Sequence, residues 1–119
     1  GLIIPAGMIP EDVIDIAYKI HNDVSIPEGF ELAQNYPNPF NPETEINYSI
    51  PEASNVKLEI FNKKKQKVAT IVDEYQGVGY YSVKWDSKDS NGHQVSSGIY
   101  FYRLTASRYA STKKMILMK

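Results

Sequence analysis

The chain has 119 residues and a formal net charge of −1, a length that fits one domain with an appendage. It contains no cysteine, which excludes a disulfide framework and a thiol nucleophile. No apolar run reaches the length of a membrane span, and no secretory signal is recognisable. We therefore expect a domain with its own hydrophobic core, cut from a longer precursor.

Charge and proline are unevenly distributed along the chain. Residues 1–51 carry eight acidic residues and one base, whereas residues 52–119 carry six acidic residues and twelve bases. All seven prolines lie at or before Pro51. Nucleic-acid binding is one interpretation of the basic half, but its lysines are scattered, which favours attraction within the chain and solvated lysines on strand faces. We therefore expect no nucleic-acid partner.

The first 26 residues leave two interpretations open. Between Ile14 and Ile20 every second residue is apolar, as in a strand, but the apolar spacing from Val13 to Ile20 also fits one face of a helix. Because β-branched residues dominate, a strand is favoured within residues 11–21. We expect residues 1–26 to be the tail or last strand of a preceding module plus a linker, and residues 27–119 to form the main domain.

Three prolines and three asparagines fall within eight residues, which we call the strap: Asn35, Tyr36, Pro37, Asn38, Pro39, Phe40, Asn41 and Pro42. Each proline fixes its own φ and biases the preceding residue towards an extended conformation. The asparagines recur at every third residue, so a polyproline-like path would place them on one edge, near backbone groups they can bond. The two aromatic residues, Tyr36 and Phe40, are expected to anchor the strap in the core.

Short runs of alternating apolar and polar residues follow the strap at intervals near ten residues. We expect strands at 43–50, 56–61, 67–72, 81–85, 99–106 and 112–118, separated by turns. With the segment that leads into the strap, this gives an all-β chain of about seven strands. Such a pattern is typical of an antiparallel β-sandwich of immunoglobulin or fibronectin type III character, and Trp85 is its expected central aromatic.

Residues suited to catalysis form no recognisable constellation. His21 and His93 fall at predicted turns or strand ends without a partner at a suggestive spacing. A phosphate-binding glycine loop, a nucleophile elbow and a zinc-ligand spacing are all absent from the sequence. We therefore expect no enzymatic activity.

The polar loop that follows Trp85 is the candidate metal site. Asp86, Asp89 and Asn91 supply the hard oxygen donors that calcium prefers, and Gly92 permits a sharp turn. An ordinary hairpin loop favours the same residue types. Calcium is the one cofactor that the sequence suggests, and the alternative is a loop without metal.

The run Phe30-Glu31-Leu32-Ala33-Gln34 and the strap that follows it resemble the opening of type A C-terminal sorting domains of the type IX secretion system. These domains are related to FlgD-like immunoglobulin-like domains. The similarity continues through Trp85-Asp86, Asn91-Gly92 and residues 97–104 to the final Thr112-Lys113-Lys114-Met115-Ile116-Leu117-Met118-Lys119. It covers about residues 27–119.

Lys65 and Ser87 depart from the family pattern, because glycine is usual or frequent at both positions. A lysine forced to a positive φ would cost on the order of 1 kcal/mol. We therefore expect the hairpin after Phe61 to use another turn or to place Asn62 in the left-handed conformation.

The resemblance implies a non-catalytic sorting and anchoring module at the C-terminus of an exported bacterial protein. The outer-membrane secretion machinery would recognise it in the periplasm, and the upstream cargo of the same precursor would be secreted or reach the cell surface. Cleavage would fall near residues 21–29. The expected recognition residues are those of the strap together with Lys113, Lys114, Met115, Ile116, Leu117 and Lys119 of the last strand, an edge to which a partner's sheet can add.

The alternative function is a structural, adhesive or carbohydrate-binding immunoglobulin-like surface domain. It rests on the nine tyrosines, of which Tyr80, Tyr81, Tyr100 and Tyr102 lie on two predicted strands. Core and cross-strand packing is the competing explanation, because one face of each strand must fill the core. The oligomeric state is left open.

Overall fold

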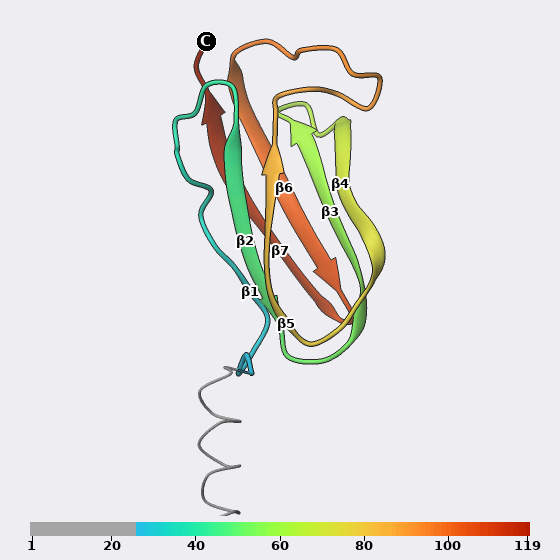
Figure 1. Ribbon diagram of the computed structural model, residues 1–119. Coiled ribbons are helices and arrows are strands. Elements are labelled where there is room, and N and C mark those ends of the chain that lie inside the picture. Colours follow the sequence, from blue (N-terminus) through green and yellow to red (C-terminus); the bar gives the residue numbers. More distant parts are fainter. Residues whose placement is uncertain (1–25) are drawn as a thin grey trace, which may run out of the picture.

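The structure, a computed structural model, describes residues 26–119. The expected strand or helix at residues 11–21 and the preceding module lie outside the described residues. Residues 26–119 form seven strands in two antiparallel sheets packed face to face (Figure 1). The predicted all-β sandwich is confirmed. No helix in the described part of the chain is long and apolar enough to cross a membrane.

The strands follow the predicted order. They are β1 (Glu31–Leu32), β2 (Thr44–Ile50), β3 (Ser54–Asn62), β4 (Lys67–Gln76), β5 (Gly79–Trp85), β6 (Gly98–Ala106) and β7 (Tyr109–Leu117). Their bounds differ from the prediction in that β4 ends at Gln76 and not at residue 72, and β7 begins at Tyr109 and not at residue 112. One sheet has the order β1-β2-β5 and the other the order β4-β3-β6-β7. The last strand of the chain therefore lies at an edge of the four-stranded sheet, as predicted.

The alternation in the sequence places every second side chain in the core. Along β6 the residues Tyr100, Tyr102, Leu104 and Ala106 are buried, and their neighbours are half-buried or exposed. Trp85 is buried between the sheets, 5.9 Å from the Phe40 ring and 5.5 Å from the Tyr100 ring between centroids. The prediction that Trp85 is a central core aromatic is therefore confirmed.

Lys65 itself adopts the left-handed conformation, with φ = 67°. The expectation that another turn or Asn62 would take this role is therefore wrong. Asn62 instead supports the turn through its side chain, whose Oδ1 accepts the backbone N–H groups of Lys64 (2.9 Å) and Gln66 (3.0 Å). These bonds hold the hairpin closed although a lysine stands where glycine would be less strained.

The two ends of the sandwich differ in what they carry. The C-terminus, the β3–β4 hairpin and the long β5–β6 loop gather at one end, and the chain enters the described part at the other (Figure 1). The strap runs from β1 to β2 along the side of the molecule where β7 lies (Figure 1). It thereby brings the two segments that carry the family resemblance into contact.

Candidate recognition site

The strap begins at Asn35, whose side chain is buried. Its backbone N–H donates to the Tyr102 hydroxyl (2.8 Å), which donates in turn to the Ala33 carbonyl (2.6 Å). The Asn35 side-chain amide donates to Thr44 Oγ1 (2.9 Å) and to the Pro37 carbonyl (3.2 Å). Burial raises the pKa of Tyr102 to about 12, so its hydroxyl stays protonated at physiological pH. The start of the strap is therefore bonded to a core residue of the opposite sheet.

The two aromatic residues of the strap point in opposite directions. Phe40 is 2% exposed and packs against Trp85, whereas Tyr36 is 80% exposed. The prediction of a core anchor is confirmed for Phe40 and wrong for Tyr36. Tyr36 is held through its backbone, which exchanges hydrogen bonds of 2.9 and 2.8 Å with Glu45 of β2.

The second half of the strap pairs with the edge of β7. The Phe40 N–H donates to the Ile116 carbonyl (3.0 Å), and the Met118 N–H donates to the Phe40 carbonyl (2.9 Å). These two bonds form a parallel bridge between Phe40 and Leu117. The strap thus bonds β2 at Tyr36 and β7 at Phe40, and it links the two sheets on this side of the sandwich.

Two side chains extend this cover along the same edge. Asn38 Oδ1 accepts the Ile116 N–H (2.9 Å), and Gln34 Nε2 donates to the Lys114 carbonyl (2.7 Å). Because β6 and β7 are antiparallel, every second residue of β7 directs its backbone N–H and carbonyl groups away from β6. Of these outward groups, all those from the Lys114 carbonyl to the Met118 N–H are bonded to the strap or to Gln34.

The other half of the β7 edge lacks these hydrogen bonds, although the Phe30 ring stacks on Tyr109, where β7 begins, at 5.1 Å between centroids. By the same alternation, Ala110 and Thr112 direct their N–H and carbonyl groups away from β6. Within residues 26–119 none of these groups takes part in a hydrogen bond outside the sheet. The open edge, which we define as the outward backbone groups from the Ala110 N–H to the Lys114 N–H, is long enough for a short strand of another molecule to pair with it.

The asparagines of the strap do not share one edge, contrary to the polyproline-like prediction. Asn35 points inward, Asn38 bonds β7, and Asn41 is exposed. The expectation that they bond nearby backbone groups is confirmed for Asn35, which bonds the Pro37 carbonyl, and is wrong for Asn38, whose partner Ile116 is 78 residues away. The peptide bonds that precede Pro37, Pro39 and Pro42 are cis.

The predicted recognition residues of β7 divide between core and surface. Met115 and Leu117 are buried in the core, Ile116 is half-buried on the outer face, and Lys114 is exposed there. Lys119 donates its backbone N–H to Ser97 Oγ (3.1 Å) and its ammonium group to the Val95 carbonyl. A partner of the folded domain can therefore reach Lys113, Lys114 and the backbone edge, but not the Met115 or Leu117 side chains.

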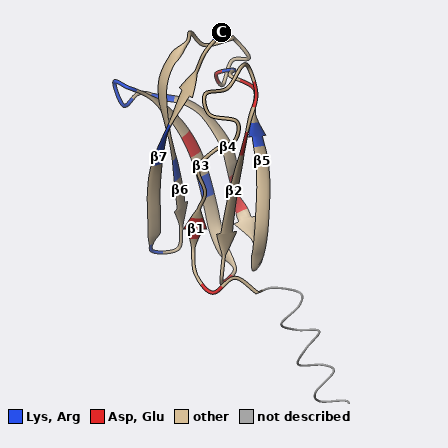
Figure 2. Cartoon of the chain, turned by 90° about the vertical axis from the view of Figure 1, so that its left-hand side faces the viewer, with Lys and Arg blue, Asp and Glu red and all other residues tan. Residues whose placement is uncertain are grey.

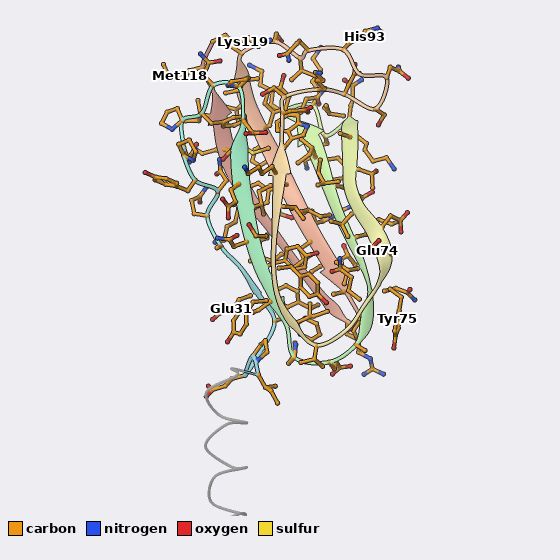
Figure 3. The ribbon with its side chains drawn as sticks, viewed as in Figure 1. Glu31, Glu74, Tyr75, His93, Met118 and Lys119 are labelled. Atoms are coloured by element: carbon orange, nitrogen blue, oxygen red, sulfur yellow. The ribbon has the colours of Figure 1, made fainter. Side chains whose placement is uncertain are left out.

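The candidate calcium loop uses its oxygens to hold its own turns. Asp89 Oδ1 accepts the N–H groups of Asn91 and His93, each at 2.9 Å, and Asp86 Oδ1 accepts that of Lys88 (3.2 Å). The bond from the His93 backbone lowers the pKa of Asp89 below its usual range. The loop lies at the end of the sandwich that carries the C-terminus, as His93 shows (Figure 3). No group of three or more acidic or histidine residues in the described part could hold a metal ion, and calcium binding stays a prediction.

Three residues outside the predicted set complete the site. Tyr102 bonds the strap and Gln34 bonds β7 as described above, and the buried Ser87 donates its hydroxyl to the Pro42 carbonyl. Ser87 has a φ of 66°, so it combines a conformation that favours glycine with a hydrogen bond that glycine cannot make. Only its departure from the family pattern distinguishes Ser87 in the sequence.

The tyrosines do not form a single platform. Tyr100 and Tyr102 are buried, in agreement with the core-packing explanation. Tyr75 (67% exposed) lies on the outer face of the four-stranded sheet and Tyr80 (62% exposed) on that of the three-stranded sheet. A carbohydrate surface built from stacked tyrosines therefore has no support in this arrangement.

The three-on-four antiparallel arrangement and the core around Trp85 define an immunoglobulin-like β-sandwich. The model of the FlgD Ig-like domain matches residues 41–109, and the chain belongs to this family. The match begins near the end of the strap and stops at the start of β7. No curated protein matches the chain.

Three solved structures share the fold. The structure of dimeric latent PorU from Porphyromonas gingivalis has a TM-score of 0.61 at 19% identity, covering 76% of this chain and 10% of that one. PorZ from the same organism, described as an essential bacterial surface component of the type IX secretion system, has a TM-score of 0.50 at 15% identity, covering 77% and 12%. FlgD from P. aeruginosa has a TM-score of 0.50 at 25% identity, covering 62% and 58%. The chain thus spans about a tenth of the length of PorU and PorZ.

Proposed function

We propose that this domain is a non-catalytic sorting and anchoring module that directs an exported bacterial protein across the outer membrane by type IX secretion. Its partners are the outer-membrane secretion machinery and the cargo of the same precursor, and its destination, reached through the periplasm, is the medium or the cell surface. The proposal is supported by the resemblance of the strap and the last strand to type A sorting domains. The fold shared with PorZ, a surface component of that system, is consistent with it.

The observation that carries the proposal is the contact between the strap and β7. Both segments that resemble sorting domains meet at one edge, where Phe40 bonds Ile116 and Met118. The open edge beside them offers unpaired backbone groups, so a partner can recognise the folded domain by adding a strand. Lys113 and Lys114 flank that edge and would disfavour unspecific pairing with other strands.

Export of a reporter fused to the N-terminus of the full chain, in a host with type IX secretion, tests the proposal. Deleting the last strand is a poor probe, because the loss of the buried Met115 and Leu117 would unfold the sandwich. Thr112→Pro removes one N–H from the open edge, where proline is tolerated, and leaves the bonds to β6 intact. We expect this variant to melt cooperatively and to remain in the periplasm.

A charge-reversal pair provides the matched comparison. Lys113→Glu with Lys114→Glu changes the basic flank of the open edge, and Lys57→Glu with Lys84→Glu makes the same change in charge elsewhere on the surface. We expect the first pair to reduce export and the second to leave it unchanged. Normal export of both the first pair and Thr112→Pro, with the fusions folded, would show that the open edge is not the recognised element.

A further inference from the structure

Apolar side chains gather on the outer face of the four-stranded sheet, at the end of the sandwich that carries the C-terminus. Phe61 of β3 is paired with Phe101 of β6, and Ile99 of β6 is paired with Ile116 of β7. All four side chains alternate with core residues and therefore point away from the core; each is half-buried or exposed. Met118 continues the same face and is 57% exposed, and it lies at the end of the molecule (Figure 3). We call these five residues the apolar patch.

Basic residues lie on two sides of the apolar patch. Lys63, Lys64 and Lys65 form the tip of the hairpin that directly follows Phe61, and all three are exposed. The hairpin projects from the end of the four-stranded sheet as a continuous basic segment (Figure 2). On the other side of the patch, the exposed Lys114 lies opposite Phe101 across the β6–β7 pairing.

The acidic residue nearest to Phe61 along β3 does not neutralise these lysines. Glu59 is buried and forms ion pairs with Lys67 (3.5 Å) and Arg103 (3.7 Å). The Arg103 guanidinium also lies over the Phe61 ring, 4.9 Å from its centroid. Within residues 26–119 no acidic side chain forms an ion pair with Lys63, Lys64 or Lys65. The hairpin therefore presents three charges that an external anionic surface can meet.

The shape of the hairpin is fixed before any partner arrives. Asn62 Oδ1 accepts two backbone N–H groups of the loop, and Asn62 Nδ2 donates to Gln66 Oε1 (2.9 Å). Lys65 occupies the left-handed position of the turn, where a glycine would be less strained. A charged residue thus stands at a position where backbone geometry alone would favour an uncharged one.

We propose that the apolar patch and its basic hairpin form a surface that docks on an anionic lipid surface. Lysines attract phosphate-bearing headgroups, and the exposed Ile99 and Met118 side chains enter the region between headgroups and acyl chains. A second copy of the chain is a poorer occupant, because its own basic hairpin would approach like charges. An acidic protein would be attracted by the lysines, but its polar surface would leave the apolar patch without a matching partner.

This proposal does not depend on the sorting function, because the substitutions that test it lie in neither the strap nor the open edge. Sedimentation of the full chain with vesicles of phosphatidylcholine and phosphatidylglycerol tests it, with pure phosphatidylcholine vesicles as the reference. We expect binding to the anionic vesicles that weakens as salt is raised. Each lysine near such a surface strengthens partitioning about fivefold, so replacing Lys63, Lys64 and Lys65 by Gln should weaken it about a hundredfold.

A matched triple variant separates a local site from general attraction. Replacing Lys57, Lys84 and Lys88 by Gln changes the net charge equally but leaves the hairpin intact, and these three lysines are exposed. We expect it to bind nearly as the unaltered chain does, whereas Ile99→Ser with Met118→Ser should lower partitioning several-fold at unchanged net charge.

Several results would overturn the proposal. They are absence of binding to the anionic vesicles, equal losses in the two lysine triples, or full binding by the Ile99→Ser, Met118→Ser variant. Binding that poly-glutamate abolishes while anionic vesicles do not compete would assign the surface to an acidic protein. Self-association that Met118→Ser removes, without vesicle binding, would assign it to a second copy. Thermal melting of every variant shows whether the sandwich has remained folded.

Discussion

Replacing Phe40 by alanine tests whether the strap is part of the sandwich or only a connection on its surface. The Phe40 side chain is 2% exposed and contacts Trp85, while its backbone forms both bonds of the bridge to β7. Truncation of a buried phenylalanine costs about 3–5 kcal/mol, from lost burial and from the cavity that remains. For a domain of this size each kcal/mol lowers Tm by about 4–8 °C. We therefore expect Phe40→Ala to lower Tm by at least about 12 °C.

Tyr36→Ala is the matched comparison, because Tyr36 is the other aromatic residue of the strap and is 80% exposed. Surface substitutions of this kind stay within about 0.5 kcal/mol. Urea unfolding of both variants, followed by Trp85 fluorescence, gives the two free energies directly. Equal losses for Phe40→Ala and Tyr36→Ala would refute the conclusion that the two rings face opposite ways. A loss below about 1 kcal/mol for Phe40→Ala would show that the strap does not contribute to the core.

The remaining predictions concern the turns, the buried tyrosine and the loop. Lys65→Gly should raise the unfolding free energy by up to about 1 kcal/mol, because glycine adopts a positive φ without strain. Ser87→Gly should not raise the unfolding free energy, because it also removes the buried hydrogen bond to the Pro42 carbonyl. Tyr102→Phe should cost about 1–3 kcal/mol, because it leaves an N–H and a carbonyl at the start of the strap without their partner. The pKa of Tyr102 is about 12 in the fold and 10.0 ordinarily, so its contribution is full below pH 10 and is lost as pH rises from there towards 12. If the Asp89 loop binds calcium, Tm should rise with calcium and Asp89→Asn should abolish the rise.

Each of these predictions has a contrary outcome. A gain for Ser87→Gly equal to that for Lys65→Gly would show that the hydroxyl contributes nothing. Urea unfolding between pH 8 and pH 12 should show that the unfolding free energy of Tyr102→Phe falls less steeply with rising pH than that of the unaltered chain. Identical pH profiles would assign the alkaline loss of stability to other tyrosines, such as Tyr48, whose pKa is also raised to about 12 by burial. An unchanged Tm in the calcium titration removes the metal site.

The sequence predicted the strands well because their signal is local. Alternation along 43–50 and 99–106 fixes which side chains face inward. The turn residues located the strands less exactly, since β4 ends at Gln76 and β7 begins at Tyr109. The positive φ of Lys65 was not predicted, because local preference alone disfavours a lysine there. Side-chain bonds from Asn62 close the turn and offset that preference.

The candidate site was predicted in its parts but not in its assembly. The strap and the last strand were both singled out, yet nothing in the sequence relates Asn38 to Ile116, which are 78 residues apart in the chain. Gln34 and Ser87 were missed for the same reason, since their roles consist of single hydrogen bonds to distant backbone groups. Residue type alone does not specify such a partner.

What the sequence determined by itself is a proline-rich strap, a set of alternating strands and the face of each strand that is buried. Periodicity and proline chemistry act over a few residues, and they need no knowledge of the rest of the chain. The tertiary structure decided which aromatic residue of the strap is buried, Phe40 and not Tyr36, because that depends on where Trp85 and β7 lie. It also decided that one half of the β7 edge is covered and the other open. Gln34 and the strap bond the edge from the Lys114 carbonyl to the Met118 N–H, and they leave the outward backbone groups of Ala110 and Thr112 without a hydrogen bond.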